Sequence, residues 1–210
     1  MEVTGIILAG GKSLRLGRNK AMETIGGVPL IERVINSLTP ITNKLILVTG
    51  KDNKSFSSIK SVEIVADIHP DKGPLSGIYT GLYYSGNLTN IVVACDMPFL
   101  NTELLEHMTK LLPSFDAIVP RWPNGQIEAL YAAYSISCLP AIRKNLENNQ
   151  FSVNAFLKKM HVLHLNKRGF SKFDPDLLSF FNINTQADVD LANKLVARES
   201  LNIPRDKTLG

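Results

Sequence analysis

The sequence predicts an α/β fold in which a doubly wound, mostly parallel sheet carries helices on both faces. Short apolar runs rich in valine and isoleucine alternate along the chain with longer amphipathic segments. Residues 91–94 are apolar at every position, as in a central strand that is buried on both faces. The chain has 210 residues, 44% of them hydrophobic and 20% charged, which is enough to bury a sizeable core without disulfides.

In the first half of the chain, short apolar runs that predict strands alternate regularly with longer amphipathic segments that predict helices. The expected elements are strand 3–8, helix 29–38, strand 44–48, a short edge helix within 52–60, strand 62–66, a helix from Gly73-Pro74, strand 91–94 and helix 102–111. Pro29 is suited to the first turn of its helix, and Pro40 ends that helix. Asn101 is a good N-cap for the helix that follows it.

The second half predicts a change of strand direction. The expected elements are strand 116–119, a loop at 121–125, strand 128–134 running antiparallel, helices 136–146 and 153–160, strand 162–165, an exposed break at 167–169 and a last helix. Thr185 and Asp188 come close to a capping box at the start of that helix. We expect a single domain over residues 1–198 and a flexible tail over residues 199–210.

The bulk properties exclude several functional classes. The net charge of +4 is dispersed along the chain, which fits a small anionic substrate and argues against nucleic acid as a partner. Cys95 and Cys138 lack the spacing of a zinc site and are expected to be reduced thiols. No targeting segment or membrane-length apolar run is visible, so we expect a cytoplasmic protein that does not enter a membrane.

A glycine-rich basic loop follows the first predicted strand. Gly10-Gly11 can turn the chain sharply and leave backbone N–H groups uncovered, which makes a concavity for phosphate. Four cations stand within nine residues of it, at Lys12, Arg15, Arg18 and Lys20. The spacing matches neither a P-loop nor a dinucleotide-binding fingerprint. A solvated basic loop is the alternative reading.

Three predicted loops lie at the carboxyl ends of strands, where open α/β sheets bind their ligands. They cover residues 8–20, 67–77 and 95–99. Asp96 ends the buried fourth strand, and binding Mg²⁺ would offset the cost of burying its carboxylate; capping the next turn is the structural alternative. Asp67 can contact a nucleotide or can simply initiate a turn. Cys95 is read as a packing residue, because no histidine is placed to activate it.

Four motifs in order carry a family resemblance. They are Leu8-Ala9-Gly10-Gly11-x-Ser13-x-Arg15-x-Gly17-x-x-Lys20, Gly73-Pro74-Leu75-Ser76-Gly77, Cys95-Asp96-Met97-Pro98 and Phe181-Asn182-Ile183-Asn184-Thr185. The first resembles the signature loop of Rossmann-like nucleotidyltransferases, and the set resembles the molybdenum cofactor guanylyltransferase family. The resemblance implies transfer of GMP from GTP to the phosphate of molybdopterin, with Mg²⁺ bound and pyrophosphate released.

The resemblance also implies roles for individual residues. Leu8, Ala9, Gly10 and Gly11 would border GTP, Arg15 and Lys20 would neutralise its triphosphate, Asp67 would contact the nucleotide, Asp96 would bind Mg²⁺, and Asn182 and Asn184 would lie near molybdopterin. For the two asparagines, turn chemistry before a helix is an equally good reading. The implied catalytic set is Arg15, Lys20 and Asp96. Proteins that handle the molybdenum cofactor are possible partners.

The sequence departs from the family pattern in two places. Thr49-Gly50 stands where an asparagine is usual, and the segment at 128–131 lacks a frequent proline. The second departure weakens the expectation for the molybdopterin side. A nucleotidyltransferase of the same fold that uses CTP or a sugar phosphate is the rival reading. A noncatalytic nucleotide-binding protein is the rival from another class, and retention of the catalytic set argues against it.

Overall fold

The structure is a computed structural model, and it describes residues 2–10, 20–50 and 54–200. Its centre is a seven-stranded sheet in the order β5-β4-β1-β6-β8-β7-β9. The strands are β1 (Val3–Ala9), β4 (Lys44–Thr49), β5 (Glu63–Ala66), β6 (Thr89–Ala94), β7 (Ala117–Pro120), β8 (Tyr131–Ser135) and β9 (Val162–Leu165). The predicted mostly parallel α/β fold is confirmed.

One strand of this sheet runs against the others. β8 pairs antiparallel with both β6 and β7, whereas β5, β4, β1 and β6 pair in parallel and so do β7 and β9. β6 therefore lies at the middle of the sheet, between the parallel half and the reversed strand. The predicted central position of this strand and the predicted reversal are both confirmed.

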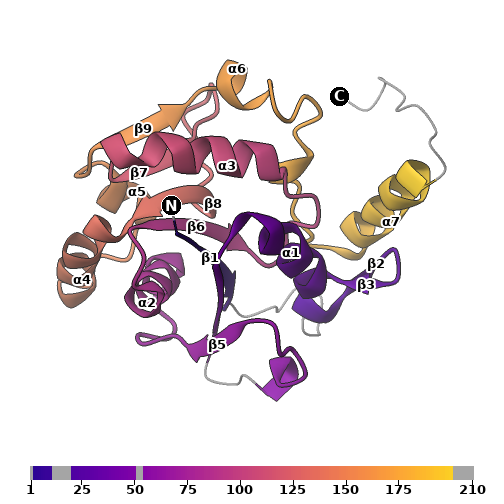
Figure 1. Cartoon of the computed structure of the whole chain (residues 1–210), viewed down its shortest axis with the longest axis horizontal. Helices are drawn as coiled ribbons and strands as arrows, with labels where there is room; N and C mark the ends of the chain where they lie inside the picture. Colours follow the sequence, from indigo (N-terminus) through magenta and orange to yellow (C-terminus); the bar gives the residue numbers. More distant parts are fainter. Residues whose placement is uncertain (1, 11–19, 51–53, 201–210) are drawn as a thin grey trace.

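Helices cover both faces of the sheet. They are α1 (Leu30–Leu38), α2 (Pro74–Ser85), α3 (Thr102–Leu111), α4 (Leu139–Glu147), α5 (Val153–Leu157), α6 (Lys167–Phe170) and α7 (Gln186–Ser200). Adjacent residues of β1 point to opposite faces of the sheet, so they show which helix covers each face. Gly5 approaches Leu38 of α1, whereas Ile6 approaches Gly81 of α2. Figure 1 shows α3 on the side of α1, and α4 beside α2.

A short hairpin outside the main sheet was not predicted. β2 (Thr24–Ile25) pairs with β3 (Val28–Pro29) through the two-residue turn Gly26-Gly27, where both glycines have positive φ. This is the turn that a glycine pair between two-residue strands favours. α7 packs on this hairpin and shares with it a second core cluster, whose buried members are Ile25, Leu30, Ile183, Val189 and Ala192. The C-terminal helix is thereby held beside the hairpin of residues 24–29 (Figure 1).

Most remaining differences from the predicted elements concern their bounds. A 3-10 helix at Lys54–Phe56 represents the expected short edge helix, and another at Ile136–Cys138 precedes α4. The exposed break predicted at 167–169 is wrong: α6 forms there, because the Asn166 side chain accepts from the Gly169 N–H and Phe170 is buried.

Two elements differ from the prediction at their ends. Residues 128–130 do not belong to β8, although a strand was expected to begin at 128; β8 starts only at Tyr131. α7 extends to Ser200, and the rest of the expected tail lies outside the described residues. None of the helices in the described part of the chain has the length and apolarity that crossing a membrane requires.

Candidate active site

Strand register brings the predicted loops to one edge of the sheet. Ala9 of β1 pairs with Thr49 of β4, and Thr49 pairs with Ala66 of β5. Leu8 pairs with Ala94 of β6 on the other side of β1. The segments that follow these parallel strands therefore emerge side by side, as expected at the carboxyl edge of an open α/β sheet.

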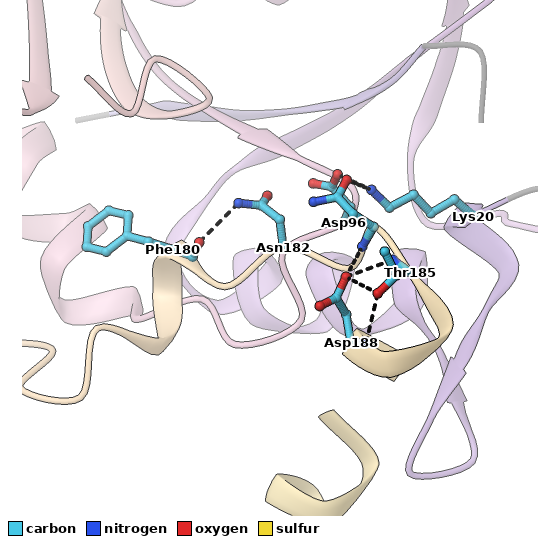
Figure 2. A network of polar contacts seen from close by, with 7 residues as sticks. Lys20, Asp96, Phe180, Asn182, Thr185 and Asp188 are labelled. Atoms are coloured by element: carbon cyan, nitrogen blue, oxygen red, sulfur yellow. Dashed lines mark hydrogen bonds and ion pairs between the residues drawn. The ribbon is translucent and has the colours of Figure 1, made fainter. Parts of the chain in front are cut away.

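The centre of this edge is an ion pair between Lys20 and Asp96. Lys20 Nζ lies 2.6 Å from Asp96 Oδ2 (Figure 2). It also donates to Asn184 Oδ1 at 2.9 Å. The side chains of Lys20 and Asp96 are only 14% and 22% exposed. Three segments far apart in sequence thus meet at one ammonium group. A partly buried, charge-assisted contact of this kind holds the lysine in a fixed position.

The second oxygen of Asp96 is the most unusual atom of the site. Asp96 Oδ1 is buried and has no hydrogen-bond partner among the described residues. A buried carboxylate oxygen without a donor is costly, since it has lost water without gaining a hydrogen bond. The atom is therefore suited to accept a ligand, and a hard cation is the ligand that a carboxylate oxygen binds best.

The segment at 182–184 is attached to the same aspartate through the backbone. The Ile183 N–H donates to the Asp96 carbonyl at 2.9 Å, and the Ile183 side chain is buried in the second core cluster. The neighbouring asparagines have different positions. Asn184 contacts Lys20, whereas Asn182 lines a cavity and donates from Nδ2 to the Phe180 carbonyl at 3.0 Å (Figure 2).

The start of α7 is fixed by a reciprocal cap. Asp188 Oδ2 accepts from the backbone N–H groups of Asn184 and Thr185 at 2.8 and 2.7 Å, and Thr185 Oγ1 accepts from the Asp188 N–H. Burial alone would raise the pKa of Asp188, but these hydrogen bonds, with Lys20 nearby, lower it below its ordinary value. The predicted cap is confirmed, and it holds Asn184 in place toward Lys20.

Asp67 is held by its own loop. Its Oδ1 accepts from Ser76 Oγ at 2.5 Å, from Thr80 Oγ1 at 2.9 Å and from the His69 N–H at 3.1 Å. The last of these is the turn-initiating contact, and the first two tie the carboxylate to the first turns of α2. Asp67 therefore organises the loop that precedes α2, and the structure places it at the same edge as Asp96.

A cavity of about 430 Å³ opens beside Asp96. Its walls are Pro74 of α2, the end of β6 with Asp96, residues 127–130 of the β7–β8 loop, residues 151–154 before and within α5, and Asn182. This volume is typical of a small-molecule site. Of the predicted site residues that the structure describes, Asp96 and Asn182 line the cavity.

The other predicted residues divide into two groups. Leu8 is buried, Ala9 is half-buried and Gly10 is exposed at the end of β1, while Gly11 and Arg15 lie outside the described residues.

Cys95 is unsuited to nucleophilic attack, because burial and the adjacent Asp96 raise the pKa of its thiol to about 12. In the described part of the chain, no three His, Cys, Asp or Glu side chains gather to hold a metal ion.

The fold and the site together define a nucleotidyltransferase. Residues 5–163 match the family described as the MobA-like NTP transferase domain. The chain is 34% identical over 201 residues to a probable molybdenum cofactor guanylyltransferase of Natranaerobius thermophilus, covering 94% of this chain and 98% of that protein. It is 32% identical to the molybdenum cofactor guanylyltransferase of Desulfosudis oleivorans, covering 92% and 96% of the two chains.

A solved structure agrees with these relatives. The molybdopterin-guanine dinucleotide biosynthesis protein A of Archaeoglobus fulgidus superposes with a TM-score of 0.81 at 30% identity, covering 94% of this chain and all of that one. The chain belongs to the MobA-like NTP transferases and, within them, to the molybdenum cofactor guanylyltransferase family. The resemblance seen in the sequence motifs is confirmed.

Two features of the site escaped prediction from sequence. The contact between Lys20 and Asn184 joins residues 164 positions apart, and it depends on the unpredicted hairpin that receives α7. Glu128 lines the cavity, although it was assigned to a strand. The glycine pair at 26–27 was the available signal for the hairpin. No comparable signal distinguished Glu128 from a strand residue.

Proposed function

We propose that this protein transfers GMP from GTP to the phosphate of molybdopterin and releases pyrophosphate. The observation that carries the proposal is the position of Asp96. It follows β6 at the same edge of the sheet as the end of β1, it lines the cavity, and its buried Oδ1 has no partner among the described residues. A carboxylate in this position can serve both substrates. The guanylyltransferase names of the relatives support the choice of GTP and molybdopterin.

Mg²⁺ fits this site. Asp96 Oδ1 is a hard oxygen ligand, and Mg²⁺ is commonly held by one or two carboxylates together with substrate phosphates and water. When bound, the ion would neutralise charge on the phosphates and orient them for transfer. Asp96 is the residue that we propose as its ligand.

Lys20 has a separate task in the proposal. Its ammonium is held by Asp96 Oδ2 and Asn184 Oδ1, and its contacts with the described residues thus leave one of its three donors for a substrate phosphate. A fixed cation at this place neutralises negative charge without having to reorganise during the reaction. Arg15, together with the backbone of residues 8–11, is proposed to bind the rest of the triphosphate.

The reaction needs little covalent chemistry from the protein. An oxygen of the molybdopterin phosphate attacks the α-phosphorus of GTP and forms a new phosphorus–oxygen bond. The bond between the α-phosphorus and the bridging oxygen breaks, and pyrophosphate leaves with the electron pair. The attacking phosphate is already anionic near neutral pH, so no general base is required. Positioning and charge stabilisation are then the main contributions of the chain.

Pyrophosphate release tests the proposal. The purified protein is incubated with Mg²⁺ and each nucleoside triphosphate in turn, with and without molybdopterin. We expect rapid release only with GTP and molybdopterin together. Release with CTP in place of GTP would identify the rival nucleotidyltransferase, and binding of GTP without any release would identify the noncatalytic one. Proteins that deliver molybdopterin or receive the product are the partners that this function implies.

A further inference from the structure

Glu128 is a fixed carboxylate in the wall of the cavity. Its backbone N–H donates to the Pro120 carbonyl at 3.0 Å, and its own carbonyl accepts from the Tyr131 N–H at 3.1 Å. Its side-chain Oε1 accepts from Trp122 Nε1 at 2.6 Å. The backbone and the carboxylate of Glu128 are therefore both held in place before a ligand binds, which reduces the conformational entropy lost on binding.

The tryptophan that holds Glu128 is itself packed. The Trp122 ring meets Phe170 and Phe180 edge-on, with centroids 5.3 Å away in each case. Phe180 also provides the carbonyl that Asn182 contacts. Glu128 and Asn182, two polar side chains of the cavity, are thus both positioned by one aromatic cluster. A site in which polar groups are held by packed aromatic residues is typical of ligand recognition.

The chemistry of this wall selects a particular kind of ligand. A carboxylate only accepts hydrogen bonds, and its two oxygens offer about four acceptor positions, of which Trp122 uses one. It is best satisfied by two neighbouring N–H donors. Phe151 and Leu130 add apolar surface to the same cavity. A flat heterocycle with a ring N–H next to an amino group, such as a 2-amino-4-oxopyrimidine, meets both requirements.

We propose that Glu128 recognises the 2-amino-4-oxopyrimidine edge of the pterin in the acceptor substrate. Guanine carries the same edge, but Glu128 lies in the β7–β8 loop, beyond β6 from the β1 loop that we assign to the nucleotide. The pterin then lies against Glu128 while its phosphate reaches Asp96 and Lys20. This assignment rests on the proposed function and makes Glu128 a specificity-determining residue of the acceptor side.

The Michaelis constants of the two substrates test this assignment. Glu128→Gln keeps the size of the side chain but turns one acceptor into a donor, which would face the donors of the pterin. We expect the KM for molybdopterin to rise roughly tenfold to a hundredfold, as for loss of a charge-assisted hydrogen bond. The KM for GTP should change less than about twofold. Glu147→Gln, which removes an equal charge from an exposed side chain at the end of α4, is the matched control and should leave both constants unchanged.

Fluorescence provides a second test that needs no turnover. The chain has one tryptophan, and its indole donates to Glu128, so a ligand at Glu128 should change its emission. We expect anaerobic titration with molybdopterin to change the emission of the wild-type protein and to give a much weaker Kd in Glu128→Gln. An equal Kd, no emission change in the wild type, or a rise in the KM for GTP would overturn the assignment. A fluorescence response without turnover would instead count against the proposed function alone.

Discussion

Replacing Asp96 by asparagine removes the negative charge from the centre of the site while keeping the shape of the side chain. The change breaks the 2.6 Å ion pair with Lys20 and removes the carboxylate that we propose as the Mg²⁺ ligand. Exposed ion pairs are worth about 0 to 1 kcal/mol, and breaking a fully buried pair costs about 3 to 5 kcal/mol. The pair is partly buried, and Lys20 keeps its contact with Asn184.

We therefore expect Asp96→Asn to lower the free energy of unfolding by about 1 to 2 kcal/mol, or roughly 3 to 6 °C in Tm for a chain of this size. Turnover should fall much further. Loss of one preorganised electrostatic group costs about a hundredfold to a thousandfold. A thousandfold loss corresponds to about 4 kcal/mol of transition-state stabilisation. The loss of stability leaves the protein folded and cannot produce such a change.

The assay measures pyrophosphate release and thermal unfolding on the same samples. Asp116→Asn is the matched control, because the Asp116 carboxylate likewise accepts hydrogen bonds from distant residues, from Ser137 Oγ at 2.8 Å and from the His161 N–H at 3.0 Å. Asp116 precedes β7 and so lies at the opposite edge of the sheet. It should lose similar stability and keep its turnover. Retention of more than a tenth of wild-type turnover in Asp96→Asn would refute the role of Asp96.

Three further substitutions test other parts of the structure. Asn184→Ala frees one contact of Lys20, so the KM for GTP should rise severalfold in steady-state assays while Tm changes little. Asp188→Asn should lower stability at pH 7 by about 1 kcal/mol. The folded-state pKa of Asp188 is lowered, so the stability that its carboxylate adds is fully present above the ordinary pKa of 3.8. This stability is lost as the pH falls through the lower folded-state pKa. Urea unfolding of the wild type and the variant at several pH values measures the loss. Gly81→Ala would place a Cβ 2.3 Å from Ile6 Cγ2 and should cost about 1 to 3 kcal/mol in urea unfolding; unchanged stability would contradict the close packing of α2 on β1.

The sequence was most informative where structure is local and buried. The β-branched run of β6 and the capping residue Asn101 each depend on neighbours in sequence, and both predictions hold. The shortest elements could not be predicted in this way. Hairpin β2–β3 has two-residue strands and α6 has four residues, so each spans only about one period, and an apolar pattern cannot repeat within it.

The geometry of the site depended on contacts that no local pattern encodes. Asn184 meets Lys20 because α7 docks on the hairpin, which is a tertiary event. Glu128 begins a stretch that continues as an apolar run, like a buried strand, but its backbone bonds to Pro120 and Tyr131 hold it in a loop. For the residues that the structure describes, the motifs predicted which ones lie at the carboxyl edge of the sheet. They did not predict which of them face the cavity and which face the lysine.

The most direct test of the account is the composition of the product. The protein is incubated anaerobically with Mg²⁺, GTP labelled in the α-phosphate, and molybdopterin, and the product is separated and hydrolysed. The account predicts one GMP recovered from the product for each pyrophosphate released. Labelled GMP that appears only free in solution, or a pterin product without guanine, would contradict transfer to the molybdopterin phosphate.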